Sequence, residues 1–262
     1  MVNVFSEAPS LREVDISVYT RWISLPWIQL THLRLSKIVL SECLNILQKT
    51  LKLEVLRLSD LDGLGSNPSR PHVILPSLRT LSLSHDPDTI IEHLTLPALQ
   101  TLGLRSIDIA SPTRWVNIGL RSAWPLRSIT TWEMAPNARD ICLRSLPSLA
   151  LVNIYNSNNE HDYYDSLVNL LAHDDQFLPA LCSLALHSFY VIPTLPLPLK
   201  EMVEMVEMVA SRWNGKRAGV SKLESFHLAV VRGAQSVKAT DKLRMELLPL
   251  ATEGLQVDIR IN

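Results

Sequence analysis

Short runs in which leucine alternates with polar residues recur along the whole chain. Clear copies are PSLREVDIS from Pro9, LKLEVLRLS from Leu51 and LPSLRTLSLS from Leu75, and they follow the loose pattern L-x-x-L-x-L. The nine copies begin at Pro9, Trp27, Leu51, Leu75, Leu96, Trp124, Leu146, Leu178 and Ser221. Because side chains alternate between the two faces of a strand, each copy predicts a short strand with one apolar face.

The spacing of the copies indicates how the strands assemble. Their last apolar residues are Ile16, Leu35, Leu58, Leu83, Leu104, Thr131, Ile154, Leu186 and Leu228. The first six steps span 19 to 27 residues, close to the roughly 20 to 29 residues of a leucine-rich repeat. We expect an α/β fold, an irregular leucine-rich-repeat solenoid with a curved parallel sheet and with helices and loops on its convex side. It would form one domain over residues 1–262, with about nine irregular repeats.

A doubly wound sheet is the alternative architecture. It needs regular helices between its strands, whereas connectors such as DGLGSNPSRPHV are too short or too rich in proline and glycine.

The tandem EMVEMVEMVA, Glu201 to Ala210, fits a helix that covers the sheet. Residues at helical spacing form an apolar arc made of Met202, Met205, Val206, Val209 and Trp213. The glutamates fall on the opposite arc, and Met208 is expected to point outward with them.

The residue after each final apolar position should lie on the open, concave face. This row reads Ser17, Ser36, Ser59, Ser84, Arg105, Trp132, Tyr155, His187 and Ala229. Arg, Trp and Tyr are enriched at binding hot spots, so Arg105, Trp132, Tyr155 and His187 are the candidate partner-binding residues. Trp132 lies in the degenerate copy PLRSITTWEM, where a register shifted by one residue would bury it instead.

Composition narrows the function classes. The chain has 262 residues and a formal net charge of -1 without a large block of one sign, so we do not expect a nucleic-acid partner. Its three cysteines, Cys43, Cys142 and Cys182, form no C-x-x-C pair, which favours a reducing cytoplasmic or nuclear compartment. Prolines interrupt the uncharged segment Phe177 to Leu199, so we expect a strand and loop there and no membrane partner.

Catalytic patterns are weak. SHDPDTIIEH gathers His85, Asp86, Asp88, Glu92 and His93, but a polar turn explains it without a metal. G-x-S-x-G is absent, and no nucleophile, base and orienting residue occur at a recognisable spacing. We therefore expect no enzyme activity, no catalytic residues, no metal and no cofactor.

The order of several phrases carries a resemblance. LPWIQLTHLRL, LRSLPSLALVNI, FLPALCSLAL and EMVASRWNGKRAGVSKLESFHL resemble the leucine-rich C-terminal region of fungal F-box proteins, a family expanded in mushroom-forming fungi. The resemblance covers nearly the whole chain, but its motifs are structural and none is catalytic.

The resemblance implies a protein-protein interaction scaffold, the substrate-recognition region of an F-box-like ubiquitin-ligase subunit. The first repeat begins at about Pro9 and the L-P pairs precede strands, so no F-box segment is expected in this sequence. A ligase adaptor is therefore not an expected direct partner; protein partners on the concave face are. The alternative function is a small-molecule-sensing solenoid or an enzyme with a pocket on the same face.

Overall fold

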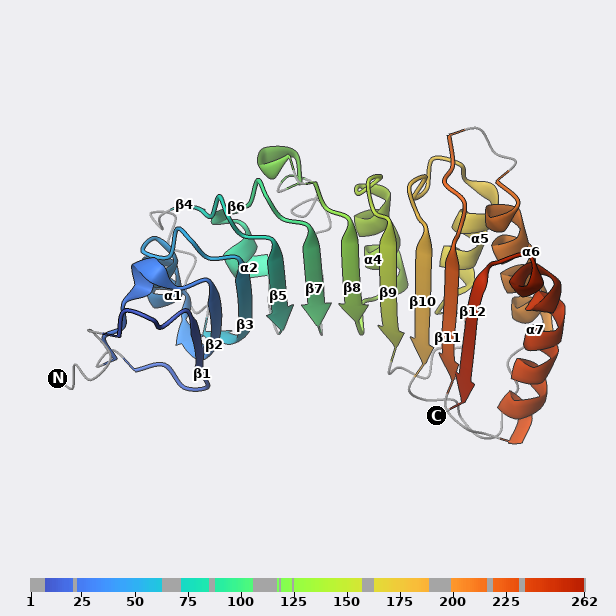
Figure 1. Cartoon of the computed structure of the whole chain (residues 1–262), viewed down its shortest axis with the longest axis horizontal. Helices are drawn as coiled ribbons and strands as arrows, with labels where there is room; N and C mark the ends of the chain where they lie inside the picture. The colour runs from blue at the N-terminus through green and yellow to red at the C-terminus, as the bar shows by residue number, and fades with distance from the viewer. Residues whose placement is uncertain are drawn as a thin grey trace. The chain divides into compact units, whose positions relative to one another are not determined.

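The computed structural model divides the chain into two compact units, Met1–Leu126 and Arg127–Asn262. It describes residues 8–20, 23–62, 72–84, 88–105, 117, 119–123, 125–156, 163–188, 199–215, 219–230 and 234–261. Both units contain parallel strands separated by helices (Figure 1), so the α/β class predicted from the sequence is confirmed.

The first unit holds five parallel strands in the order β1-β2-β3-β5-β7. Their bounds are β1 (Glu13–Ile16), β2 (His32–Val39), β3 (Val55–Asp62), β5 (Thr80–Ser84) and β7 (Thr101–Arg105). A separate pair is formed by β4 (Val73–Ile74) and β6 (Leu94–Thr95). The connecting segments contain the 3-10 helix η1 (Trp27–Gln29) and the helices α1 (Leu40–Leu47) and α2 (Asp88–Ile91).

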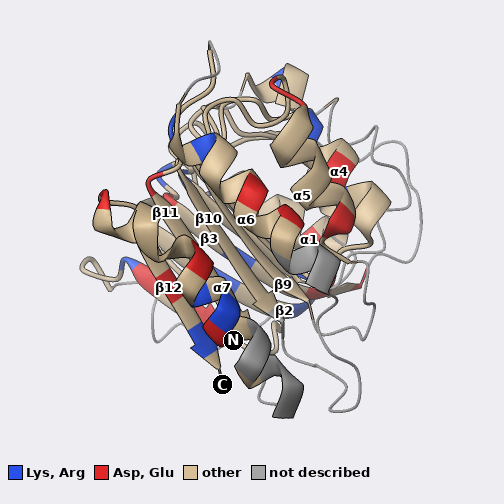
Figure 2. Cartoon of the chain, turned by 90° about the vertical axis from the view of Figure 1, so that its right-hand side faces the viewer, with Lys and Arg blue, Asp and Glu red and all other residues tan. Residues whose placement is uncertain are grey.

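The second unit is built more regularly from strand and helix in alternation. Its parallel strands are β8 (Ser128–Trp132), β9 (Leu151–Asn156), β10 (Ser183–Ser188), β11 (Ser225–Val230) and β12 (Gln256–Ile261). Between them lie α4 (Pro136–Arg144), α5 (Asp165–His173), α6 (Leu199–Trp213) and α7 (Ala234–Thr252). Neighbouring helices pack on one another in chain order, and α5 and α6 lie on the same side of the strands (Figure 2).

Strand pairing follows the repeat register within each unit. In the first unit, one row of paired residues contains Ile16, Leu35, Leu58, Leu83 and Leu104. In the second, the corresponding row contains Thr131, Ile154, Leu186 and Leu228. The leucines and isoleucines of these rows other than Ile16 are buried. A strand is present at each of the nine copies, as the sequence predicted.

The structure adds a tenth repeat-like strand that the sequence analysis did not predict. β12 pairs in parallel with β11, and Ile259 lies opposite Leu228 in the same buried row. Its sequence QVDIRI alternates apolar and polar residues but lacks the leucines of the other copies. Alternation over six residues is its only signal in the sequence, and such a short run does not by itself distinguish a strand.

Helix α6 corrects one orientation predicted from the sequence. Met205, Val209 and Trp213 are buried as expected, but Met208 is also fully buried, so the expectation that it points outward is wrong. The buried arc is wider than a single stripe because α6 packs against α5 on one side and α7 on the other. Among the tandem residues whose side chains the structure describes, Val206 is half-buried and Val203 is exposed, at 46% of its possible exposure; the side chain of Met202 lies outside that description.

Candidate functional site

Three of the four candidate residues lie in one row of the second unit. Trp132 pairs with Tyr155, and Tyr155 pairs with His187, across β8, β9 and β10. Each follows a buried residue of the leucine row, so each side chain projects from the opposite face, where it is half-buried. The register at Trp132 is therefore not shifted, although its copy is degenerate. We call these three residues the ring ladder.

The rings of the ladder are stacked. The centroids of Trp132 and Tyr155 are 5.2 Å apart with an interplanar angle of 16°. Those of Tyr155 and His187 are 4.1 Å apart and within 5° of parallel. Stacked aromatic pairs contribute about 0.5 to 1.5 kcal/mol beyond the area they bury, so the stacking favours this arrangement of the rings.

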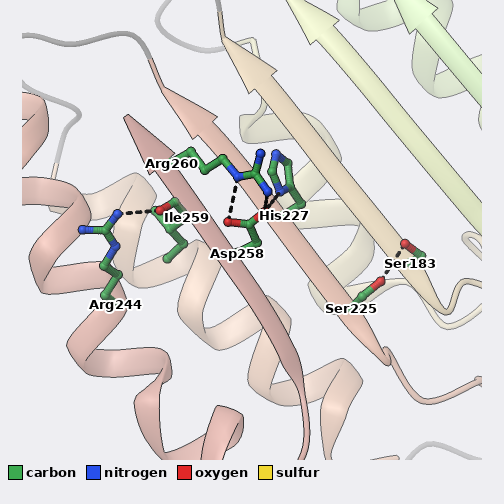
Figure 3. A network of polar contacts seen from close by, with 7 residues as sticks. All are labelled: Ser183, Ser225, His227, Arg244, Asp258, Ile259 and Arg260. Carbon is green, nitrogen blue, oxygen red and sulfur yellow. Dashed lines mark hydrogen bonds and ion pairs between the residues drawn. The ribbon is translucent and has the colours of Figure 1, made fainter. Parts of the chain in front are cut away.

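A histidine and an ion pair continue this surface beyond the ladder. The His227 ring lies 4.8 Å from that of His187, tilted by 40°. His227 Nδ1 is 2.9 Å from Asp258 Oδ2, and Arg260 contacts the same carboxylate at 2.7 Å (Figure 3). The side-chain hydrogen bond from Arg260 lowers the pKa of Asp258. Asp258 is therefore a carboxylate at neutral pH and fixes the His227 ring by accepting from Nδ1–H.

His187 is the member of the ladder whose type of side chain can change its charge near neutral pH. Partial burial lowers its pKa, and the neighbouring His227 lowers it further. Both effects disfavour the imidazolium, so the ring is neutral at pH 7.

The helix layer also fixes the backbone of His187. The Tyr164 hydroxyl donates to the His187 carbonyl oxygen at 2.9 Å. Burial raises the pKa of Tyr164, so its hydroxyl keeps the proton that this bond needs. The ring of Tyr163 meets that of Tyr164 edge-on, with centroids 5.0 Å apart.

Two buried arginines hold the helices that support the ladder strands. Arg212 on α6 donates to the main-chain oxygens of Leu171, Phe177 and Leu178, which end α5 and lead towards β10. Its side chain is 1% exposed. The bond to Leu171 satisfies a carbonyl group in the last turn of α5, where a helix leaves such groups without an intrahelical partner. The arginine of the sequence S-R-W thus has a structural role, which is to hold α6 against the end of α5 and the segment that follows it.

Arg139 on α4 plays a similar part. It forms a buried ion pair with Asp140 at 2.7 Å and donates to the Tyr163 carbonyl oxygen. Asp140 also accepts a hydrogen bond from Ser166 on α5. Through this bond Arg139 and Asp140 link α4 to α5. Both buried charges are paired and hydrogen-bonded, as a stable buried ion pair requires.

Arg105 belongs to the first unit. It ends β7, is exposed, and completes a row with Ser36, Ser59 and Ser84. The structure thus brings Trp132, Tyr155 and His187 into contact with one another and places Arg105 on the serine row of the other unit.

Sequence reasoning missed the part played by His227, Asp258 and Arg260. His227 is not in the row of candidate residues, and the strand that carries Asp258 and Arg260 was not predicted. His187 and His227 lie on neighbouring strands but not directly opposite one another. A prediction that considers only directly paired residues does not find such diagonal contacts.

Reactive groups are few in the part of the chain that the structure describes. Burial raises the pKa of Cys43 and of Cys142 to about 12, so both thiols stay protonated and are poor nucleophiles. The described residues include no group of three or more His, Cys, Asp or Glu side chains placed to hold a metal ion. His85 and Asp86 lie outside the described ranges. None of the described helices is both long and apolar enough to span a membrane.

In comparisons with known proteins, no family model matched the chain and no curated protein matched it.

Proposed function

We propose that the chain is a protein-interaction module, an irregular leucine-rich-repeat solenoid whose open face in the second unit binds a protein partner. The observation that carries the proposal is the ring ladder of Trp132, Tyr155 and His187, stacked on the face opposite the buried leucine row. Large rings held in one conformation lose little entropy on binding, which is why aromatic residues dominate binding hot spots.

The geometry of the ladder restricts how a partner can make contact. Tyr155 has Trp132 against one ring face and His187 against the other, so neither of its faces can stack on a planar ligand. Tyr155 can therefore be reached only at its ring edge, and the three rings together include an indole N–H, a phenol O–H and imidazole nitrogens as hydrogen-bonding groups. Edges of this kind fit the mixed apolar and hydrogen-bonding surface of a folded protein or peptide.

A ladder variant tests the proposal. Wild-type protein and the double variant Trp132→Ala/Tyr155→Ala are used to capture proteins from cell lysate, and the retained proteins are quantified by mass spectrometry. The matched control is Lys242→Ala/Glu246→Ala, two exposed residues on α7 of the same unit. We expect a set of proteins retained by wild type and control but lost by the ladder variant. If a ladder variant with a native circular dichroism spectrum retained the same set of proteins as wild type, the proposal would be contradicted.

We further propose that the bound protein is a substrate delivered to a ubiquitin ligase. The support for this step is the resemblance to the leucine-rich region of fungal F-box proteins, carried by phrases such as EMVASRWNGKRAGVSKLESFHL. The experiment replaces the endogenous protein with the ladder variant and follows the lifetime of a retained partner after translation is blocked. A longer lifetime supports delivery for degradation. An unchanged lifetime, with binding lost, leaves the interaction but removes the ligase role.

A further inference from the structure

The outer edge of β12 carries backbone groups that no described strand covers. Among the described strands β12 comes last in the sheet order and pairs with β11 alone. The Gln256 N–H donates to the Glu224 carbonyl oxygen, so Gln256 and every second residue after it direct their backbone groups to β11. The backbone groups of Val257, Ile259 and Ile261 therefore point away from the sheet. An open edge of this kind is a template for pairing with another strand.

An arginine side chain occupies the middle of this edge. Arg244 on α7 donates through Nη2 to the outward carbonyl oxygen of Ile259 at 2.5 Å (Figure 3). Asp241, one turn earlier on α7, accepts from Nη1 of the same guanidinium at 3.1 Å, which favours this position of the side chain. Arg244 thus places a charged group where the backbone of an added strand would have to lie.

The sequence of β12, QVDIRI, is complementary to itself. If two copies pair antiparallel about Ile259, Asp258 of each copy lies opposite Arg260 of the other. Val257 then lies opposite Ile261, so the apolar faces of the two strands coincide. Within one copy Asp258 and Arg260 already form an ion pair at 2.7 Å, and the pairing sets two such ion pairs side by side in opposite order. A second copy of this chain is therefore the partner that the edge fits.

Apolar side chains near the arginine add to the tendency to associate. Leu248 lies one turn after Arg244 on the same side of α7 and is 53% exposed. Met245, the next residue after Arg244, is 69% exposed. Contact between two copies at this end of the second unit would cover part of this apolar surface, which is favourable.

We infer that Arg244 blocks the outer edge of β12 and so prevents it from pairing with a second copy of this chain. An added strand would have to take the Ile259 carbonyl oxygen from the guanidinium and displace a charged side chain, and charged groups at a sheet edge oppose pairing for this reason. The inference goes beyond the proposed function, because it concerns the edge of the second unit and does not depend on the ring ladder or on what binds there.

The test measures self-association of the whole protein. Analytical ultracentrifugation over a range of concentrations gives the association constant, and hydrogen exchange read by mass spectrometry follows the amides of β12. We expect Arg244→Ala to associate at least about tenfold more tightly than wild type, because the backbone groups of Ile259 become free to bond across the two-fold axis. The β12 amides should become protected as its concentration rises. Arg244→Met, which keeps the aliphatic stem but has no donor, should behave in the same way.

Two further variants locate the contact. Lys242→Ala removes a positive charge from an exposed position of the same helix and should behave as wild type. Arg244→Ala/Arg260→Glu places like charges opposite one another in the antiparallel pairing, so its association should return to the wild-type level.

Several results would overturn the inference. One is a folded Arg244→Ala or Arg244→Met protein that associates no more than wild type, or no more than Lys242→Ala. Another is association that persists with Arg260→Glu or leaves the β12 amides unprotected, since the contact would then lie elsewhere. Concentration-dependent protection of β12 in wild type would show that the edge is not blocked. The Arg244 side chain is 46% exposed, so both variants should fold, and loss of the fold in both would assign it a purely structural role.

Discussion

The imidazole rings of His187 and His227 lie 4.8 Å apart on neighbouring strands, and only His227 has a carboxylate partner. His187 instead meets Tyr155 on one side and His227 on the other. One of two adjacent histidines is thus stabilised as a hydrogen-bond donor to Asp258, while the other is placed where a positive charge is unfavourable.

Acidification should destabilise the second unit through His187. Its pKa is lowered on folding, so the unfolded chain binds a proton that the folded chain resists. The stability gained from the neutral ring is present above the unfolded pKa of about 6.5 and is lost as pH falls through the folded value. In urea unfolding at several pH values between about 7.5 and 5, the free energy of unfolding should fall less steeply with acidification for His187→Phe than for wild type. Phenylalanine keeps a stacked ring but cannot titrate. Identical pH slopes for both proteins would contradict the lowered pKa.

Thr131 occupies the buried leucine row and should be a weak point of the core. It is fully buried, and its hydroxyl has no hydrogen-bond partner in the described part of the chain. Thr131→Val keeps the shape and removes the hydroxyl, so it should raise the free energy of unfolding by about 1 kcal/mol.

The neighbouring Thr130→Val is the control for this substitution. The Thr130 hydroxyl accepts a hydrogen bond from Asn153 at 3.3 Å on the open face, so removing it should bring no gain. Chemical denaturation measures both variants. A Thr131→Val protein less stable than wild type would show that the hydroxyl is satisfied.

Arg212 should be essential to the folding of the second unit. Replacing it with methionine removes three buried hydrogen bonds to carbonyl oxygens, at a cost of about 3 kcal/mol or more. Arg144→Gln breaks an ion pair with Asp174 in which the arginine side chain is 51% exposed. It should change stability by less than about 1 kcal/mol. Thermal unfolding that ranked the two variants in the opposite order would contradict the buried network.

Met208 and Val203 of the EMV tandem should differ sharply in their contributions to stability, because Met208 is buried and Val203 is exposed. Met208→Ala opens a cavity between α6 and its neighbours and should cost about 2 to 4 kcal/mol. Val203→Ala, on the exposed side of the same helix, should change stability by no more than about 0.5 kcal/mol. Equal stability of the two variants would indicate that the Met208 side chain points outward.

The sequence predicted the strands because the alternation of apolar and polar residues depends only on neighbouring positions in the chain. In LPSLRTLSLS, Leu81 and Leu83 have to share one face whatever the strand packs against, so the register across β3, β5 and β7 could be written from the sequence. The same reasoning placed Trp132, Tyr155 and His187 in one row. The role of that row in binding a partner stays a prediction.

Helix orientation could not be derived in the same way. The buried side of α6 depends on two further helices that meet it, and Met208 is buried by that packing rather than by its position in the triplet. Likewise Arg212 reads as a polar surface residue in ASRWNG, yet its side chain is buried because three carbonyl groups of a distant segment converge on it.

The sequence by itself determined the strand repeat, the face of each strand and the parallel α/β class, because alternation with a period of two is a property of neighbouring residues. Only the tertiary structure decided the rest. It brought His227 and Asp258 beside the ring ladder and added β12 to the second unit. These relations join residues from different repeats, and their distances depend on how each strand packs beside the next.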